Sequence, residues 1–498
     1  MERNHGRYYY CPSASLNSAF ISSEELCARI CHAGGKVVYM NQFNQKLAIP
    51  SLLGKTIPCT CGVKHVIPTQ DVIIKEGAIE NIATCCECHL PGKRILLVVD
   101  KITWSVVGKQ VTEILKKAGY IVEVLFMQTS ANGSVVADDQ NVEYVRAAIH
   151  PSIDFLIAVG SGTINDVVKL ASYQSGRRYL VCPTAPSMNG YTSSIAAIMS
   201  QGIKYTIPAH SPVVVVADLQ ILAAAPAAMR LAGLGDLISK PVSNADWKLA
   251  HLIKGDYYCE WPLRIVKEVE VACRSHAAAI GSGEMKAIRI LTEALILSGF
   301  SMVVAGSSSP ASGGEHLISH YWDMTAQWYE REEKLHGAQV GVATLLTSKL
   351  FEKLQQLDPK KINIATLCDH YLDWKSQERK LRKIHGPLDS EVVIVAKKKY
   401  LTLKEKEKEW AFIIENWQVI WQQLSPILIP SAEIRKILLK AEAPTTIRKL
   451  GISAEELRKA FLYAKDIRDR YTVLDFAHDL GVLESLCDEI LTESGVLD

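Results

Sequence analysis

Long hydrophobic runs are missing from this chain of 498 residues. A helix that crosses a bilayer needs about 18 consecutive apolar residues, and runs such as Val213–Val216 reach only the length of a strand. The first residues, Met1–Ala19, also lack the apolar core and the small-residue cleavage site of a secretory signal. We therefore expect a cytoplasmic protein with no membrane span.

A clear excess of charge of one sign is also lacking. The chain has 55 lysines and arginines against 53 aspartates and glutamates, a formal net charge of +2. Proteins that bind nucleic acids or anionic membranes mainly through phosphate groups need a larger positive surplus. This balance argues against nucleic acid as the main partner and predicts a small molecule instead.

The cysteines do not form a recognisable disulfide framework. Thirteen of them, an odd number, are spread along the chain, which is typical of reduced thiols. One local group could supply zinc ligands: Cys59, Cys61, His65, Cys85, Cys86 and Cys88. Neither half of this group is a Cys-x-x-Cys pair of the usual kind. Small buried thiols and loop cysteines remain the alternative interpretation.

From about residue 70, short apolar runs alternate with segments of helical period. The runs are rich in Val, Ile and Leu and occur at Val72–Ile74, Ile95–Val99, Val122–Met127, Phe155–Val159 and Tyr179–Cys182. Between two of them, Thr103–Ala118 repeats apolar residues at the helical period, and Gly119 follows as a stop. This alternation predicts a doubly wound, Rossmann-like parallel sheet.

After Val213–Asp218 the pattern becomes helical. The expected helices include Trp247–Ile253, Glu284–Ser298, His316–Trp328 and Ser453–Asp466. We predict an extension of unknown role over residues 1–58, a Rossmann-like nucleotide-binding domain over 59–222, and an all-helical domain that binds metal and substrate over 223–498. Within the last, the alternating charges of Lys397–Trp410 predict a solvated helix face or a connector.

Two loops follow neighbouring predicted strands. Gly160–Ile164 combines two glycines with the start of a helix, where backbone N–H groups can bind a pyrophosphate. It lacks the third glycine of the dinucleotide fingerprint, because Asn165 stands there, and alone it is equally compatible with a tight turn. The second loop, Pro183–Ser194, is rich in hydroxyls where ligands of such sheets collect. A polar surface loop is the alternative.

The helical half contains four potential metal ligands: Asp236, His316, His320 and His336. Ser312 and Glu315 form a capping-box pattern that would begin a helix just before His316, and His320 follows on the same face. A carboxylate with two imidazoles leaves coordination positions open, as in catalytic rather than structural metal sites. Histidines satisfied within the core are the alternative.

Taken in order, these motifs resemble the sn-glycerol-1-phosphate dehydrogenase family, in the iron-containing alcohol dehydrogenase and dehydroquinate synthase-like superfamily. The motifs are Gly160–Thr163, Pro183–Gly190, Ala232–Asp236, Gly313–His316 with His320, and His336–Gly337. The resemblance covers Lys64–Leu350 closely, and Ile467–Thr472 is similar to longer bacterial members. It implies an active site between two domains, NAD(P)H, one divalent metal ion (zinc or nickel) and a homodimer.

The resemblance also implies roles for individual residues. Asp236, His316 and His336 match metal ligands; His320 and Asp236 match catalytic, substrate-binding residues. The matching cofactor contacts are Asp100, Gly160, Ser161, Gly162, Thr163, Ile164, Thr184, Ser187 and Ser193. Asp100 would hydrogen-bond the adenosine ribose, which favours NAD, although members use both cofactors. Asn189 stands at a substrate position where close bacterial relatives carry an aspartate, so it keeps an acceptor but loses the charge.

The implied reaction is the reversible reduction of dihydroxyacetone phosphate to sn-glycerol-1-phosphate, a precursor of lipids or of another glycerophosphate-containing polymer. The metal would polarise the ketone and the nicotinamide would deliver hydride. Candidate partners for the substrate phosphate are Lys204, Lys240 and Arg468. Two alternatives remain: a sugar-phosphate cyclase (a lyase) of the dehydroquinate synthase type, and a catalytically weak binding or regulatory homologue, which Asn189 suggests.

Overall fold

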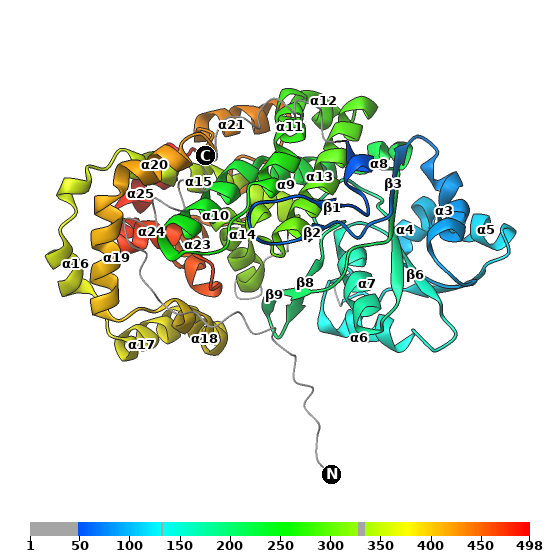
Figure 1. Cartoon of the computed structure of the whole chain (residues 1–498), viewed down its shortest axis with the longest axis horizontal. Helices are drawn as coiled ribbons and strands as arrows, with labels where there is room; N and C mark the ends of the chain where they lie inside the picture. Colours follow the sequence, from blue (N-terminus) through cyan, green and yellow to red (C-terminus); the bar gives the residue numbers. More distant parts are fainter. Residues whose placement is uncertain (1–47, 131–132, 327–333) are drawn as a thin grey trace, which may run out of the picture.

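The computed structural model describes residues 48–130, 133–326 and 334–498. Most of the predicted N-terminal extension, residues 1–47, lies outside these residues, as does the end of the predicted helix at Trp328. A parallel sheet with its helices forms one end of the molecule, and packed helices form the other (Figure 1). The predicted fold class, a Rossmann-like sheet followed by a helical region, is confirmed.

Six parallel strands build the main sheet in the order β3-β10-β7-β6-β4-β5. Their bounds are β3 (Asp71–Lys75), β4 (Arg94–Val99), β5 (Ile121–Phe126), β6 (Phe155–Val159), β7 (Arg178–Cys182) and β10 (Val214–Asp218). All residues of β6 and β10 are buried, as expected for strands covered on both faces. The chain turns to opposite sides of β4 at β5 and β6, so the topological switch point lies between β4 and β6.

Helices cover both faces of this sheet. They are η2 (Ala78–Asn81), α3 (Ile82–His89), α4 (Lys101–Thr103), the π-helical turn η3 (Trp104–Gly108), α5 (Lys109–Lys117), α6 (Asp139–Ala147) and α7 (Gly162–Gln174). Alternate residues of β4 point into two hydrophobic cores, one on each face of the sheet. Leu97 lies in the same core as Val111 of α5, and Val98 lies in the same core as Val167 of α7. The helix predicted over Thr103–Ala118 is therefore present, but a π-helical turn interrupts it.

Two short hairpins and one short helix were not predicted. The helix is α2 (Ile49–Leu52); β1 (Thr56–Ile57) pairs with β2 (His65–Val66), and β8 (Ile195–Ser200) pairs with β9 (Ile203–Pro208). In β8 only two of six residues are buried, which explains why it lacks the continuous apolar run of the sheet strands. Gln201 and Gly202, both with positive φ, form the turn between β8 and β9.

After β10 the described residues contain helices only. The α-helices are α8 (Leu219–Ala224), α9 (Ala227–Ile238), α10 (Lys240–Lys254), α11 (Trp261–Ser275), α12 (Ala277–Ser282), α13 (Met285–Ala305), α14 (Gly314–Thr325), α15 (His336–Gln355), α16 (Ile364–His370), α17 (Trp374–His385), α18 (Asp389–Lys399), α19 (Leu403–Glu415), α20 (Trp417–Leu424), α21 (Ser431–Lys440), α22 (Ile447–Leu450), α23 (Ala454–Tyr463), α24 (Val473–Asp479) and α25 (Leu483–Glu493). Short 3-10 turns are η4 (Ser309–Ala311), η6 (Pro359–Lys361), η7 (Gly386–Leu388) and η8 (Ala464–Ile467).

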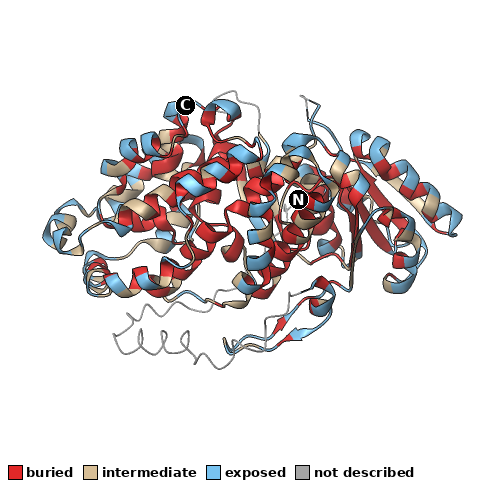
Figure 2. Cartoon of the chain, turned by 90° about the horizontal axis from the view of Figure 1, so that it is seen from above, coloured by how far each residue is buried: buried red, intermediate tan, exposed pale blue. Residues whose placement is uncertain are grey.

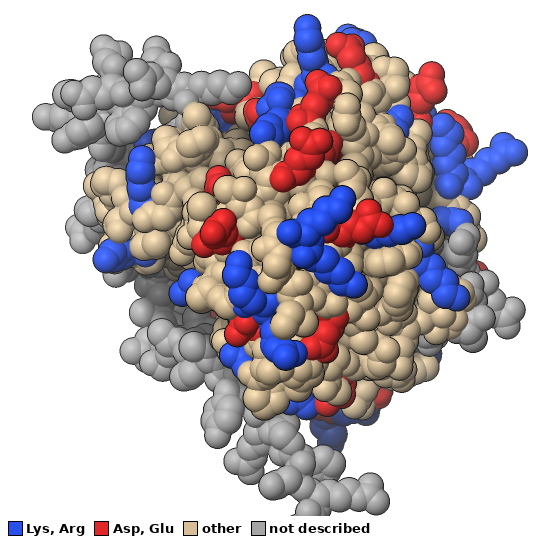
Figure 3. Space-filling view, turned by 90° about the vertical axis from the view of Figure 1, so that its right-hand side faces the viewer, with Lys and Arg blue, Asp and Glu red and all other residues tan. Residues whose placement is uncertain are grey.

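Helix α13 is long and apolar enough to cross a membrane by length and composition, but 78% of its most apolar window is buried inside the protein. It packs against α11 and α9, so it is a core helix. Buried residues are concentrated along the helices in the middle of the molecule (Figure 2). On the face over the sheet end, basic and acidic side chains are interspersed (Figure 3).

The predicted solvated face over Lys397–Trp410 is partly wrong. Lys406 and Glu409 are only 6% and 4% exposed, and the Lys406 ammonium lies 2.6 Å from carboxylate oxygens of both Glu409 and Asp479. Lys406, Glu409 and Asp479 therefore form a buried ion cluster, because every third or fourth residue of α19 faces the neighbouring helices.

Candidate active site

Close contact between α9 and α15 brings Asp236 beside His336. A Cβ atom at Gly235 would lie 2.2 Å from the carbonyl oxygen of Gly337, and a Cβ at Gly337 would lie 1.9 Å from the carbonyl oxygen of Ala232. Only glycine permits these separations, since any larger residue would push the two backbones apart. The glycines next to Asp236 and His336 are thus what places the two side chains together.

Helix α14 carries His316 and His320, but its start differs from the prediction. The helix begins at Gly314 with Gly313 as N-cap, and the predicted capping box of Ser312 and Glu315 is wrong. The Gly314 N–H donates to Asp246 at 2.7 Å, so a buried aspartate of α10 satisfies the helix end. This leaves the Glu315 carboxylate 2.7 Å from His316 Nδ1, which turns His316 Nε2 towards Asp236.

Asp236, His316 and His336 form a group whose ligand atoms all lie within 4.8 Å of one another. His316 Nε2 is 3.3 Å from Asp236 Oδ1, and His336 Nδ1 is 3.1 Å from the hydroxyl of Ser319. One oxygen and two nitrogen donors suit zinc or nickel, and three protein ligands leave positions for substrate. Glu315 and Ser319 are the outer partners that such histidines require. The residues present therefore fit a catalytic divalent ion.

Burial and charge set the protonation of these groups. Burial raises the pKa of Asp236, but the Lys240 ammonium and His316 outweigh this effect and bring the pKa below its usual range. Burial, reinforced by the charge of Lys204, holds the pKa of His336 well below its usual range. Asp236 is therefore ionised and His336 neutral at physiological pH, the forms that bind metal ions.

His320 lies against this group from the adjacent turn of α14. Its ring stacks on that of His336 with centroids 5.5 Å apart. Its Nδ1 atom is buried without a hydrogen-bond partner among the described residues. Burial and then the charge of Lys204 hold the pKa of His320 well below its usual range. A neutral imidazole with a free ring nitrogen therefore faces the site. Buried polar atoms normally have a hydrogen-bond partner, so the free nitrogen is consistent with a ligand that binds here.

The Pro183–Ser194 loop reaches this site through Asn189. Its backbone N–H and its side-chain amide donate to the two carboxylate oxygens of Asp236, at 2.8 and 2.9 Å. Lys240 lies on the same carboxylate, with its ammonium 3.4 Å from Oδ1 and 3.0 Å from the carbonyl oxygen of Ala311. The structure thus brings the sequence-predicted Asn189 into direct contact with Asp236.

Lys169 holds this loop in place, and the sequence interpretation missed it. Its fully buried ammonium donates to the carbonyl oxygens of Gly190 and Ile195 at 2.6 and 2.9 Å, and lies 3.1 Å from Ser193 Oγ and Asp166 Oδ1. A lysine within the apolar stretch of α7 was the available signal. Ser193, a predicted nucleotide contact, is 1% exposed and uses its hydroxyl within this network.

The other predicted nucleotide residues gather at the carboxyl edge of the sheet. Asp100 follows β4 and accepts the Thr103 N–H at 2.7 Å, and Gly160–Thr163 joins the adjacent β6 to α7. A Cβ at Gly160 would lie 2.5 Å from the side chain of Ile164, so the turn requires glycine. Ile164 itself is buried. This edge is the switch point between β4 and β6, where such sheets bind ligands.

Thr184 and Ser187 follow β7, the next strand along this edge. Both are nearly buried, and Ser187 shares a short hydrogen bond with Ser161 of the glycine loop. Tyr191 adds a contact of 3.1 Å to Ser161. Hydrogen bonds therefore join the glycine loop to the loop that carries Asn189.

Two of the three candidate phosphate partners lie on the His320 side of the site. The positive charges of Lys204 in β9 and of Arg468 after η8 both lower the pKa of His320, after burial, and Arg468 donates to the carbonyl oxygen of Lys204. The Lys204 ammonium is 2.7 Å from Asp323. Lys240 is also paired, with Asp236 at 3.4 Å, so the two lysines differ in position: Lys240 lies at the Asp236 carboxylate, whereas the charge of Lys204 acts on His320. The structure thus separates candidates that the sequence could not.

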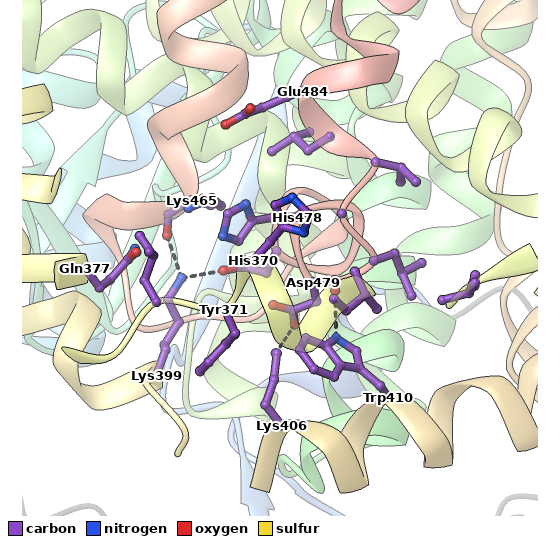
Figure 4. Close-up of a pocket in the computed structure, with 18 of the residues that line it drawn as sticks. His370, Tyr371, Gln377, Lys399, Lys406, Trp410, Lys465, His478, Asp479 and Glu484 are labelled. Carbon is purple, nitrogen blue, oxygen red and sulfur yellow. Dashed lines mark hydrogen bonds and ion pairs between the residues drawn. The ribbon is translucent and has the colours of Figure 1, made fainter. Parts of the chain in front are cut away.

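A cavity of about 900 Å³ lies elsewhere, among the C-terminal helices, and its lining includes none of the predicted site residues. Figure 4 shows Lys399 and Lys406 directed at acceptors. Lys399 lies 2.6 Å from Asp475, and Lys406 lies 2.6 Å from Asp479. These lysines are already paired with carboxylates, and the potential metal ligands lie elsewhere, so we place the reaction at the Asp236 group.

The predicted cysteine group is split. Cys85 and Cys86 are buried in the core formed by α3 and the sheet, and Cys88 is exposed, so their assignment to a common metal site is wrong. Cys59, Cys61 and His65 do come together, but with Cys259 from the helical half. Helix α3 faces the sheet, which separates its cysteines from the β1–β2 hairpin.

Comparison with known proteins shows which family the chain resembles. Residues 73–226 match the iron-containing alcohol dehydrogenases. A glycerol-1-phosphate dehydrogenase [NAD(P)+] of Bacillus licheniformis is 30% identical over 438 residues, which are 88% of this chain and 96% of the relative. Its counterpart from Pyrococcus furiosus is 32% identical over 335 residues, 66% of this chain and 88% of that protein.

Solved structures show the same fold. A 1,3-propanediol oxidoreductase has a TM-score of 0.56 at 15% identity, covering 86% of this chain and 98% of the other. The glycerol dehydrogenase of Schizosaccharomyces pombe has a TM-score of 0.54 at 15% identity, covering 86% and 92%. Identities this low support a shared architecture only.

Proposed function

This chain belongs to the glycerol-1-phosphate dehydrogenase family of iron-containing alcohol dehydrogenases, and we propose that it reduces dihydroxyacetone phosphate to sn-glycerol-1-phosphate with NAD(P)H, reversibly. The observation that carries the proposal is the close group of Asp236, His316 and His336, in contact through Asn189 with the loop beside the nucleotide edge. The relatives are named as dehydrogenases, so they do not favour the cyclase alternative.

We propose that Asp236, His316 and His336 hold a zinc or nickel ion. When bound, the ion supplies Lewis-acid polarisation of the substrate carbonyl. Asp236 is prepared for this role because Lys240 and Asn189 keep its carboxylate ionised and oriented. Glu315 and Ser319 orient the two imidazoles.

We propose that the nucleotide binds at the carboxyl edge of the sheet. The Gly160–Thr163 turn lets the backbone approach the pyrophosphate at the N-terminus of α7, where the helix dipole favours negative charge. Asp100, after β4, would accept a hydrogen bond from the adenosine ribose. Thr184 and Ser187 line the same edge, so the cofactor would extend from β4 towards the Asn189 loop.

We propose that the substrate phosphate pairs with Lys204 and Arg468, whose charges reach His320. His320 would contact the substrate and relay to it the proton that the product hydroxyl receives after hydride transfer. Because its pKa lies well below the usual range, the ring rests neutral, so it would take up a proton from solvent as it passes one to the substrate. Asn189 would hold a substrate hydroxyl through its amide oxygen.

The wider setting of the enzyme follows the same reasoning. We infer a cytoplasmic enzyme, supported by the burial of α13 within the fold. A homodimer is proposed from the family resemblance. The product would feed synthesis of a lipid or of another glycerophosphate-containing polymer.

The test is NADH and NADPH oxidation, followed by loss of absorbance, with zinc- or nickel-loaded protein and dihydroxyacetone phosphate. We expect turnover that is abolished by His316→Ala and kept by the matched control His150→Ala, a surface histidine beside Glu123. Chiral analysis should identify sn-glycerol-1-phosphate. Net NADH consumption excludes the cyclase, which recycles its cofactor. Metal-loaded protein that binds nucleotide without turnover would support the binding homologue instead.

A further inference from the structure

Four potential metal ligands that the proposed reaction does not use meet between the β1–β2 hairpin and the loop joining α10 to α11. They are Cys59, Cys61, His65 and Cys259, with ligand atoms all within 4.8 Å of one another. Figure 1 shows the hairpin lying beside α13. We propose that these four residues bind a Zn²⁺ ion as a closed structural site, separate from the catalytic one.

The local fold explains why the hairpin presents three of the ligands. Ile57 of β1 pairs with His65 of β2, so the segment between them must turn back on itself and carries both cysteines at its bend. Gly62 supplies a positive φ of 83° in this bend, a backbone conformation that glycine adopts without strain. Cys259, the fourth, comes from the opposite half of the sequence.

The distances match tetrahedral zinc. With Zn–S near 2.3 Å and Zn–N near 2.0–2.1 Å, tetrahedral geometry places two sulfurs about 3.8 Å apart, and sulfur and nitrogen about 3.6 Å apart. The sulfurs of Cys59 and Cys259 are 3.6 Å apart, and Cys259 Sγ is 3.5 Å from His65 Nε2. Cys61 Sγ is 3.1 Å from the same nitrogen. Small movements would therefore complete the coordination shell.

The chemistry of the four donors distinguishes this site from the Asp236 group. Three thiolates and one imidazole are a donor set that selects zinc, and four protein ligands leave no position for substrate. His65 and Cys259 are each 2% exposed. Outer donors are also in place: the Cys61 N–H points to Cys59 Sγ at 3.4 Å, and the Tyr257 hydroxyl lies 3.3 Å from Cys61 Sγ. Such donors offset the negative charge of bound thiolates.

A site here would fasten the start of the described chain to the helical half. Cys59 and Cys259 are 200 residues apart in sequence, and Trp261 Nε1 adds a hydrogen bond of 3.0 Å to the carbonyl oxygen of Pro58. Closing so long a loop restricts the unfolded chain, and the binding energy of the ion adds to folding. All four ligands lie outside the family match of residues 73–226.

Metal analysis of the full-length protein tests the proposal, with zinc per chain measured by mass spectrometry. Wild type loaded with zinc should hold two ions, and both Cys61→Ser and Cys259→Ser should lose one. His316→Ala should also lose one, but from the catalytic site. Cys88→Ser, which changes an exposed cysteine outside the group, is the matched control and should keep both.

Cobalt substitution assigns the ions, and its main readout is the wild-type protein, so it does not depend on variants that fold poorly. Co²⁺-loaded wild type and His316→Ala should both show thiolate-to-cobalt charge-transfer absorption, and this absorption should be weakened in the Cys259→Ser protein. Absence of thiolate bands in wild type would overturn the proposal. So would a Cys59–Cys259 disulfide found by peptide mapping, or unchanged zinc content in both cysteine variants. Retention of these bands without NADH turnover would leave this site established and the proposed reaction refuted.

Discussion

Asn189, where the family resemblance predicts an aspartate, lies in direct contact with Asp236, and this contact gives the asparagine a physical role. It donates to both oxygens of the Asp236 carboxylate. An aspartate at this position would present a second carboxylate where the amide now donates. The asparagine therefore stabilises the carboxylate group of the site before any ion is bound.

The substitution Asn189→Asp should consequently make the protein depend more strongly on metal. Replacing a donor by a like charge beside buried Asp236 should lower the free energy of unfolding of the metal-free protein by about 1–3 kcal/mol. Added zinc or nickel should reverse this loss, because the ion is attracted to both carboxylates. Thermal unfolding with chelator and with metal measures both effects. A variant with wild-type stability in chelator would contradict the assigned contact.

His210, in the segment that follows β9, should make stability depend on pH. Burial, together with the charge of Lys169, lowers the pKa of His210 to about 4, and its ring stacks on Tyr179 with centroids 5.7 Å apart. The unfolded chain therefore binds one more proton than the folded one between about pH 4 and 6.5. The contribution of neutral His210 is complete above this range and is lost as pH falls through it.

The substitution His210→Phe should keep the stacking and remove this proton. Denaturation midpoints measured across the same pH range should fall less steeply for the variant than for wild type. The reference variant is His150→Phe, at a half-exposed histidine. Parallel pH profiles for wild type and His210→Phe would show that His210 titrates normally in the folded protein.

At the scale of elements, the turn from β6 into α7 would determine how closely the proposed dinucleotide can approach. The side chain of Ile164 occupies the position that a Cβ of Gly160 would need. Ile164 is buried in the core between α7 and the sheet, so it cannot give way without moving the helix. The backbone just before α7 therefore has room for a glycine at position 160 but not for a larger residue.

Gly160→Ala should raise the KM for NADH about ten-fold or more while metal content stays at the wild-type level, because the altered turn displaces the pyrophosphate-binding N–H groups. Steady-state kinetics and metal analysis check the two parts. Ser175→Ala, at the opposite end of α7, serves as the comparison. If Gly160→Ala and Ser175→Ala had equal KM values for NADH, the proposal that this loop binds the nucleotide would be wrong.

At the scale of the whole molecule, one loop joins the two proposed binding sites. Ser187 is bonded to Ser161 of the glycine loop, Asn189 is bonded to Asp236, and Lys169 holds the segment beneath them. Ordering one end of this loop by a ligand should therefore make binding at the other end less costly.

We expect metal and NADH to bind with positive coupling. Chelation should weaken NADH binding about five-fold or more, and NADH should strengthen metal binding by the same factor, since coupling of binding is reciprocal. Fluorescence titration of NADH with and without zinc measures the effect, and Asn189→Ala should reduce it. Identical NADH affinities with and without metal would show that the loop does not connect the sites.

Much of the fold and of the candidate site was readable from the sequence because the signals are local. The six strands of the main sheet are apolar runs of strand length, and Gly160–Gly162 follows one of them directly. His316 and His320 are four residues apart on one helix, so their common face needs no tertiary information. The residue types of Asp236, His316 and His336 likewise indicated metal chemistry before their positions were known.

The tertiary structure alone decided which distant residues meet. Cys59 lies beside Cys259 rather than beside Cys85. At the start of α14 the backbone donates to Asp246 and not to Ser312, and Lys406 points inward towards Asp479. Each of these contacts joins residues far apart in sequence, whose partners depend on how whole helices pack rather than on local periodicity. The sequence by itself determined the strands of the main sheet, the helical character of the second half and the types of ligand; packing determined the partners.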